Sequence, residues 1–359
     1  MDSAIRTVFV GLSGGVDSSV AAALLLRRGY RVVGVFIRTW QPDFIECSFR
    51  EDRLDAMRVA AHLGIPFLEC DAEDAYKRAV AEYMIEEYRA GRTPNPDVMC
   101  NREIKFGVFW DFARAHGADA IATGHYARIR TDAEGTAILA KAADPAKDQA
   151  YFLYRLTSED LSHVLFPLGG MHKSKVRVLA KKFGLPTAAK KDSQGICMLG
   201  DLDIKEFLAH YIAAEPGPVL DESGEVIGRH EGAVFLTIGE RHGFTITQKT
   251  PYDAPYYIVG KDVAKNTVTV AQGGGAREAR AAASRAIALE NATWVAESPK
   301  AGKRYEAQIR YHGDYLPCTV QAGPGSTAIV IFEESVRPAS GQSVVLYDGD
   351  ICLGGGIVG

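Results

Sequence analysis

Near the start of the chain, a strand, a glycine-rich turn and a helix are predicted one directly after another. Residues 7–12 form a short apolar and β-branched run, which is typical of a buried strand in a parallel sheet. The turn reads SGGVDSS from Ser13 to Ser19, and the Ala/Leu-rich segment behind it ends at Gly29, a residue that commonly terminates helices. A buried strand that leads directly into a helix predicts the first βα unit of an α/β fold.

The residues of this turn indicate an anion site. Gly14 and Gly15 lack a Cβ, so the backbone can approach a phosphate closely while the amides of the first helical turn point at it. The three serines add hydroxyl donors, and Asp17 can hold a Mg²⁺ ion bound to phosphate oxygens. Neither the Walker GxxxxGK[ST] pattern nor GxGxxG is present. The alternative is a turn that only closes a βα unit.

The overall composition is that of an ordinary globular protein. Its 359 residues are enough for two or three domains, with 47% hydrophobic and 24% charged residues. No apolar run reaches the roughly 18 residues that span a bilayer, and no apolar leader is evident, so we expect a cytoplasmic protein with no membrane partner. The six cysteines are far apart with no CxxC spacing, which argues against a disulfide framework or a zinc finger.

The charge is unevenly distributed. A net charge of −4 argues against indiscriminate binding of nucleic acid. Residues 173–191, however, carry seven basic side chains and no acidic one. This stretch is interpreted as a local phosphate-binding face or as a solvated helix.

Strands and helices continue to alternate through the first part of the chain. Further apolar strands are predicted at residues 31–37, 67–71 and 119–123, and helices at 51–63 and 72–89. Residues 91–101 break the pattern with two prolines, and a helix is expected to resume near Glu103. This alternation predicts a doubly wound parallel sheet, in which ligands bind at the carboxyl ends of the strands. Residues 11–18, 37–40 and 124–126 lie at such ends.

The second part of the chain has the composition of β structure. Past Asp201, glycine and proline become frequent, and Val/Ile/Thr strands recur with turn signals. From Ala286 on, further short strands predict a small β-barrel, and residues 273–285 are interpreted as a linker. We therefore expect three domains: a nucleotide-binding domain at residues 1–200, a central β-rich domain at 201–275 and a C-terminal β-barrel at 285–359.

Two cysteines differ from the others in their surroundings. Cys100 and Cys197 lie in polar, Gly/Pro-bearing segments with basic neighbours, and Asp97 precedes Cys100 by three residues. Nearby positive charge lowers a thiol pKa and raises its reactivity, so two such thiols in a chain with a phosphate-binding turn suggest sulfur chemistry. A buried, inert thiol is the alternative for both. It is our interpretation of the remaining four cysteines, Cys47, Cys70, Cys318 and Cys352.

Seven separated motifs, taken together, resemble a known family. They are GLSGGVDSS from Gly11, GRTPNPDVMCN, TGHY, KDQAYFLY, DSQGIC, Arg310-Tyr311 and the terminal CLGGGIVG. In this order they resemble the tRNA-specific 2-thiouridylases of the PP-loop ATP pyrophosphatase superfamily. The resemblance implies a PP-loop domain followed by two β-rich tRNA-binding domains. It also implies an ATP-dependent tRNA-uridine 2-sulfurtransferase that replaces the C2 oxygen of the wobble uridine with sulfur.

The resemblance also implies roles for individual residues. The ATP-binding set would be Gly11, Leu12, Ser13, Gly14, Gly15, Val16, Asp17, Ser18, Ile37 and Gly124, with Asp17 as the Mg²⁺ ligand. The tRNA-binding set would be Asn95, Pro96, Asp97, Lys147, Asp148, Gln149, Arg310 and Tyr311, the first three at the target base. The catalytic set would be Cys197 as the persulfide carrier, Cys100 as its disulfide partner and Asp97 for proton transfer. Ile37 stands where the family often has Met.

The implied partners are tRNA and an upstream sulfur-donor protein, a cysteine desulfurase or a sulfur relay carrier, and we expect a monomer. Three alternatives remain at this point. The chain is another PP-loop ligase or amidotransferase, or it is a non-catalytic RNA-binding protein that senses a nucleotide. Within the enzyme interpretation, Asp97, Cys100 and Cys197 would ligate an iron–sulfur cluster instead of cycling through a persulfide and a disulfide.

Overall fold

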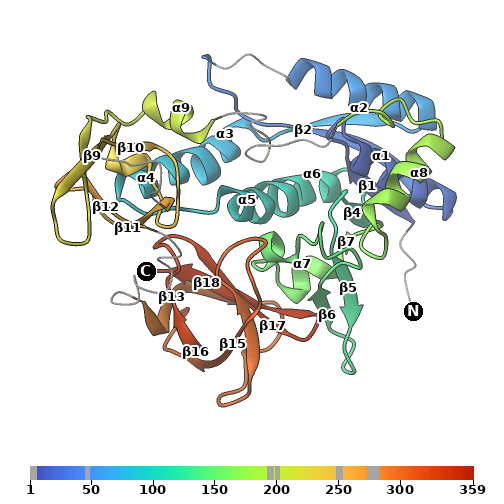
Figure 1. Cartoon of the computed structure of the whole chain (residues 1–359). Helices are drawn as coiled ribbons and strands as arrows, with labels where there is room; N and C mark the ends of the chain where they lie inside the picture. Colours follow the sequence, from blue (N-terminus) through green and yellow to red (C-terminus); the bar gives the residue numbers. More distant parts are fainter. Residues whose placement is uncertain (1–5, 45–48, 192–197, 199–202, 248–253, 273–282) are drawn as a thin grey trace.

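The computed structural model describes residues 6–44, 49–191, 198, 203–247, 254–272 and 283–359. Its first part is built on a parallel sheet with the strand order β3-β2-β1-β4-β7. The strands are β1 (Thr7–Gly11), β2 (Arg31–Arg38), β3 (Phe67–Asp71), β4 (Ala120–Ala122) and β7 (Val164–Leu165). The predicted doubly wound α/β fold is therefore confirmed, and β1, β2 and β4 end at one common edge (Figure 1).

Helices cover both faces of this sheet because its strands alternate their side chains between two apolar layers. Val8 and Val10 pack toward α2 (Phe49–Leu63), whereas Phe9, between them, joins the cluster on the opposite face. α1 (Val16–Arg27) and α8 (Lys173–Lys182) complete the first layer. The opposite layer contains α3 (Glu73–Tyr76), η1 (Lys77–Glu82), α4 (Tyr83–Arg89), α5 (Pro96–Met99), η2 (Cys100–Val108) and α6 (Phe109–Ala115).

One helix of the second layer starts earlier than its sequence suggests. The expected loop through Asn101 is wrong, because α5 begins at Pro96 and continues through η2 into α6. Proline is favoured in the first helical turn, where its missing N–H would have no intrahelical partner. η2 is a π-helical stretch. This geometry is rare in proteins, and where it does occur it is often found at a functional site.

The central part of the chain forms a separate β-rich unit. Its sheet has the order β10-β9-β8-β12-β11 and its own small apolar cluster around Val219 and Ile258. α9 (Ile204–Ala209) precedes it. The remaining elements are β8 (Gly217–Leu220), β9 (Val226–His230), η4 (Ala233–Phe235), β10 (Phe244–Ile246), β11 (Tyr256–Asp262) and β12 (Thr267–Gln272).

The C-terminal part is a closed barrel, as predicted. β13 (Ser284–Trp294) pairs with both β16 (Ala328–Val336) and β18 (Ile351–Val358), which closes the ring. β14 (Tyr305–Gln308), β15 (Leu316–Ala322) and β17 (Ser343–Asp348) complete it. The hairpin β5 (Arg128–Thr131) and β6 (Ala137–Ala140) extends the same sheet by pairing with β18, a contact that sequence reasoning did not anticipate.

Two short elements, η3 (Ala150–Leu153) and α7 (Ser158–Ser162), lie in the chain between β6 of the barrel sheet and β7 of the parallel sheet. The division into domains at residues 200 and 275–285 stays a prediction. Among the described residues, no helix combines the length and the apolar character that crossing a bilayer requires.

Candidate functional site

The glycine-rich turn lies between β1 and α1, at the carboxyl edge of the sheet. Hydroxyl groups hold its shape from inside: the Ser18 Oγ donates to the Gly15 carbonyl at 3.2 Å and accepts from the Ser13 amide at 3.2 Å. Ser19 donates to the same carbonyl at 2.6 Å. The cap residue of α1 is Gly15, which has no side chain to offer the first-turn amides. These amides therefore suit an outside anion, as predicted from the sequence.

Two glycines of the predicted ATP-binding set are required by close packing. Gly14 has a φ of +72°, and a Cβ there would lie 2.3 Å from the carbonyl oxygen of Asp52. A Cβ on Gly124 would lie 2.7 Å from the backbone nitrogen of Ser18. Gly124, at the end of β4, is therefore packed directly against the first turn of α1. Gly11 faces Ile37, whose side chain a Cβ would meet at 3.8 Å. The structure thus brings this set together.

Asp17 is the charged group of the turn, and it has partners that sequence reasoning missed. The Nζ of Lys173 donates to its two carboxylate oxygens at 2.8 and 2.7 Å, and the Tyr126 hydroxyl donates at 2.8 Å. Lys173 is the first residue of α8, so one member of the basic stretch 173–191 reaches the turn. The sequence could have indicated this contact. A lysine at the start of a helix that follows the last parallel strand can point to the same edge of the sheet as the turn.

A Mg²⁺ ion bound to phosphate oxygens would replace Lys173 as the partner of the Asp17 carboxylate. Proteins hold Mg²⁺ through one or two carboxylates together with phosphate oxygens, and Asp17 supplies one carboxylate at the turn. Such an ion would neutralise charge on the phosphates. In the part of the chain that is described, no group of three or more His, Cys, Asp or Glu residues forms a metal cluster. The iron–sulfur ligand set stays a prediction, because Cys197 lies outside the described residues.

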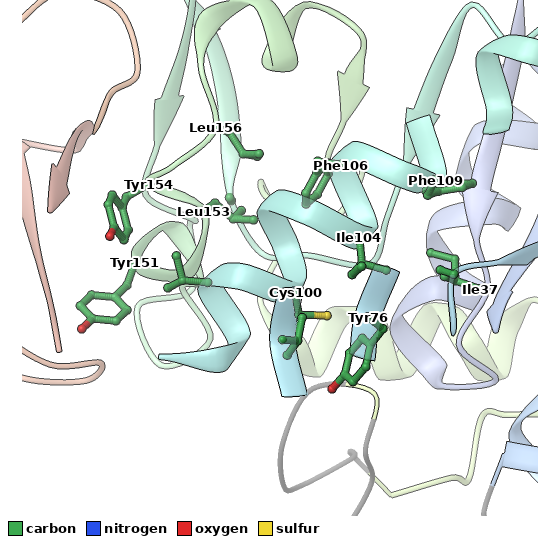
Figure 2. Close-up of a cluster of buried hydrophobic side chains, with 14 of the residues drawn as sticks. Ile37, Tyr76, Cys100, Ile104, Phe106, Phe109, Tyr151, Leu153, Tyr154 and Leu156 are labelled. Carbon is green, nitrogen blue, oxygen red and sulfur yellow. The ribbon is translucent and has the colours of Figure 1, made fainter. Parts of the chain in front are cut away.

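Cys100 is buried in the apolar layer beneath the sheet. It is the first residue of η2, its exposed fraction is 0%, and its sulfur points toward Tyr76 and Ile104 (Figure 2). The expectation of a polar loop around this thiol is therefore wrong. The positive charge of its neighbour Arg102 is compensated, because Arg102 forms an ion pair with Asp160 at 3.1 Å.

The residues on either side of the second predicted thiol in the sequence have described contacts. Cys197 lies outside the described residues. Met198, which follows it, accepts a hydrogen bond from the Gln41 side chain at 2.9 Å through its carbonyl, beyond the end of β2. Lys190, on the other side, pairs with Asp52 and Asp55 of α2 at 2.8 and 2.7 Å.

The predicted base-contacting residues lie at the start of α5. Pro96 and Asp97 occupy the first helical turn, and Pro96 is buried. Asp97 lies three residues ahead of Cys100 in the sequence. The Asn95 side chain accepts from the Ser343 amide at 2.7 Å and donates to the Gln342 side chain at 3.3 Å. This loop is thus attached to the barrel.

The loop with Lys147, Asp148 and Gln149 is connected by hydrogen bonds to the glycine-rich turn, residues 13–19, which we call the phosphate turn. Asp148 is buried and accepts from the amides of Ala142 at 2.7 Å and Ala150 at 3.4 Å, and burial raises its pKa. Gln149 bonds to Tyr126 twice, with its amide donating at 2.8 Å and its side-chain oxygen accepting at 3.0 Å. Because Tyr126 also bonds Asp17, this loop and the turn form one connected network.

The predicted pair from the barrel reaches the same surface. Arg310 is exposed, and the Tyr311 ring lies 4.3 Å from Phe152 of η3 between ring centroids. The pKa of Tyr311 is raised to about 12, mainly by burial and then by the nearby carboxylates of Asp148 and Asp97. The structure therefore gathers the predicted tRNA-binding residues of three separate segments around η3.

The comparisons with known proteins match this chain along nearly its whole length. Family models described as a tRNA methyl transferase HUP domain, a tRNA methyl transferase PRC-barrel domain and an aminomethyltransferase β-barrel domain match residues 6–201, 205–272 and 284–358. A 4-thiouridine synthetase solved with RNA and ATP aligns at a TM-score of 0.35 and 21% identity over 54% of this chain and 44% of its own, which carries no argument about function.

Comparison with full-length relatives identifies the family. The chain is 47% identical to the tRNA-specific 2-thiouridylase MnmA of Stenotrophomonas maltophilia (strain K279a), over 98% of this chain and 93% of the relative. It is 45% identical to the protein of that name from Cupriavidus necator, over 100% of both chains. The chain therefore belongs to the tRNA-specific 2-thiouridylase family.

Proposed function

We propose that this chain uses ATP to replace the C2 oxygen of a tRNA uridine with sulfur, with Cys197 as the sulfur carrier and Cys100 as its partner. One observation carries the proposal beyond family membership. A single run of helix, α5–η2–α6, connects the Asp97–Cys100 pair to Phe109, which lies 3.5 Å from where a Gly11 Cβ would stand. Nine residues of α-helix would span about 13 Å and the wider π-helical stretch η2 is shorter, so one bound, adenylated nucleotide can bridge the distance.

The chemistry requires two activations. The uridine oxygen is a poor leaving group, so it first attacks the α-phosphorus of ATP, and pyrophosphate departs. The terminal sulfur of a Cys197 persulfide then attacks C2, and AMP leaves with the original oxygen. Finally the Cys100 thiolate attacks the Cys197 sulfur, which leaves thiocarbonyl sulfur on the base and a Cys100–Cys197 disulfide for an external thiol to reduce.

The described residues suit the first of these steps. The amides of the turn and the ammonium of Lys173, which lies at the turn through its contact with Asp17, would stabilise the charge that develops on the departing pyrophosphate. Asp97 stands at the start of α5, where it can take the proton of the uracil ring. The loop of Lys147 and the Arg310–Tyr311 pair would hold RNA, mainly through phosphate contacts and stacking.

We further propose that the protein works in the cytoplasm as a monomer and receives its sulfur from a separate donor protein. Asp148 and Gln149 would support RNA binding indirectly, because their hydrogen bonds fix the loop that presents Lys147.

A single-turnover assay with tRNA, ATP and a sulfur donor tests the sulfur chemistry. We expect Cys197→Ser to abolish thiolation while tRNA-dependent release of pyrophosphate continues, and Cys318→Ala, at a buried barrel thiol, to retain both. Thiolated tRNA from the Cys197 variant would contradict the carrier role. Absence of tRNA-dependent pyrophosphate release in the wild type would contradict the whole proposal. Iron content and activity after anaerobic purification separate the persulfide route from the cluster alternative.

A further inference from the structure

The charge of Asp17 is balanced by a lysine that lies far away in the sequence. Its two carboxylate oxygens accept from the Nζ of Lys173 at 2.8 and 2.7 Å, and one of them also accepts from the Tyr126 hydroxyl at 2.8 Å. The Lys173 side chain is only 14% exposed. An ammonium group so far removed from water needs a partner of opposite charge.

The backbone that carries this lysine is fixed next to the phosphate turn. The Lys173 amide donates to the Asp144 carboxylate at 2.8 Å, at the start of α8. α8 packs beside α1, and Val176 of α8 and Val16 of α1 belong to one buried cluster (Figure 1). The Lys173 side chain is long and flexible, with four methylene groups. It can therefore change partner without movement of either helix.

A Mg²⁺ ion and this lysine compete for the same carboxylate. A divalent ion at Asp17 would leave the ammonium of Lys173 without its counter-ion and close to a second cation, which is unfavourable at a partly buried position. Phosphate oxygens that arrive with the ion supply the negative charge that the ammonium then lacks. The amides at the start of α1 favour phosphates at this same place.

We propose that Lys173 exchanges partners when Mg²⁺ and ATP bind. Its ammonium occupies the metal-binding side of Asp17 until the nucleotide arrives, and it then pairs with the phosphates. This inference rests on the proposed function for the identity of the nucleotide. It follows that a divalent metal alone binds poorly at Asp17, because the metal would have to displace the ammonium without providing a new partner for it.

Mn²⁺ binding, followed by EPR spectroscopy without nucleotide or tRNA, tests the first half of the exchange. We expect Lys173→Met to lower the Kd for Mn²⁺ by about tenfold, and Lys173→Arg to bind Mn²⁺ no better than the wild type, because a cation still holds the carboxylate. Addition of Asp17→Asn to the methionine variant should abolish the gain. Equal Mn²⁺ affinity in the methionine variant and the wild type would overturn the inference, as would a gain that survives in the double variant.

The second half is tested with Mg²⁺ and α,β-methylene ATP, in which the bond to be cleaved is blocked. Calorimetry without tRNA should show a Kd about tenfold higher in Lys173→Met and within about threefold of the wild type in Lys173→Arg. Lys175→Met, at an exposed lysine of the same helix, is the matched control and should leave the Kd within about twofold.

Unchanged nucleotide affinity in Lys173→Met would overturn the inference, because the lysine would then remain with Asp17. An equal loss in the arginine and methionine variants would also overturn it, since the exchange depends on the charge. Neither measurement requires sulfur transfer. If the wild type produced no thiolated tRNA, the proposed function would fail, and the two binding measurements would still decide the role of Lys173.

Discussion

The phosphate turn and the thiol helix lie in the same domain but are built in different ways. The turn is local: its shape depends on hydrogen bonds among Ser13, Gly15, Ser18 and Ser19, within seven residues of sequence. The thiol helix α5–η2 depends on partners that are distant in sequence. Its cap residue, Asn95, is hydrogen-bonded to Ser343 near the C-terminal end of the chain. The turn is ready to receive an anion, whereas Cys100 is sealed in the core.

This difference bears on how the two steps of the proposed reaction would be controlled. A site made of backbone amides and small side chains needs little rearrangement to bind phosphates. A fully buried thiol must be uncovered before it can attack another sulfur atom. A barrel that binds RNA would reach the start of this helix through the hydrogen bond between Ser343 and Asn95, whereas the loop of Gln149 reaches the turn through Tyr126.

Substitution of one glycine in each region should have the most unequal effect. A Cβ on Gly124 would lie 2.7 Å from the Ser18 nitrogen, whereas one on Gly107 of η2 would lie 3.2 Å from the Arg102 carbonyl. We expect Gly124→Ala to lower kcat/KM for ATP by about 100-fold, because a shift of roughly 1 Å misplaces the phosphates. Gly107→Ala should change it by less than about threefold. Pyrophosphate release in the presence of tRNA measures both, and a Gly124 variant as active as the wild type would show that the turn tolerates the shift.

The same contrast explains what could be predicted from the sequence. The turn was predicted correctly because its strand, glycines and helix are adjacent, and the parallel sheet followed from simple alternation. The burial of Cys100 was missed because two prolines suggested a loop, although Cys100 and Ile104 are four residues apart, as on one face of a helix. The hairpin β5–β6 was missed for another reason. Its partner β18 lies more than 200 residues away, and no local pattern reports such a pairing.

The burial of Cys100 should also be visible in stability. Cys100→Ala removes a buried sulfur from a packed layer and should lower the free energy of unfolding by about 1–2 kcal/mol. Ser13→Ala, at an exposed residue of the turn, should change it by less than about 0.5 kcal/mol. Urea denaturation of the two variants measures the difference. A Cys100 variant as stable as the wild type would contradict the packed, buried position on which the comparison depends.

The smallest expected effect concerns His125, which lies between the two regions. It follows Gly124 in the chain, its ring centroid is 5.6 Å from that of Phe106 in η2, and its Nδ1 lies 2.7 Å from the Thr123 hydroxyl.

Burial, and then the positive charge of Lys105, lowers the pKa of His125 well below the usual range. Below a pH of about 6.5 the unfolded chain therefore takes up a proton that the folded chain excludes, and stability is lost as the pH falls. Above that pH the contribution is fully present. His125→Gln cannot titrate, so the difference in unfolding free energy between wild type and variant should shrink by about 1 kcal/mol from pH 7 to pH 5.5. His242→Gln, at an exposed histidine, is the matched control. Parallel curves for the wild type and the His125 variant would mean that water reaches this ring, and that the boundary between the open turn and the sealed thiol lies elsewhere.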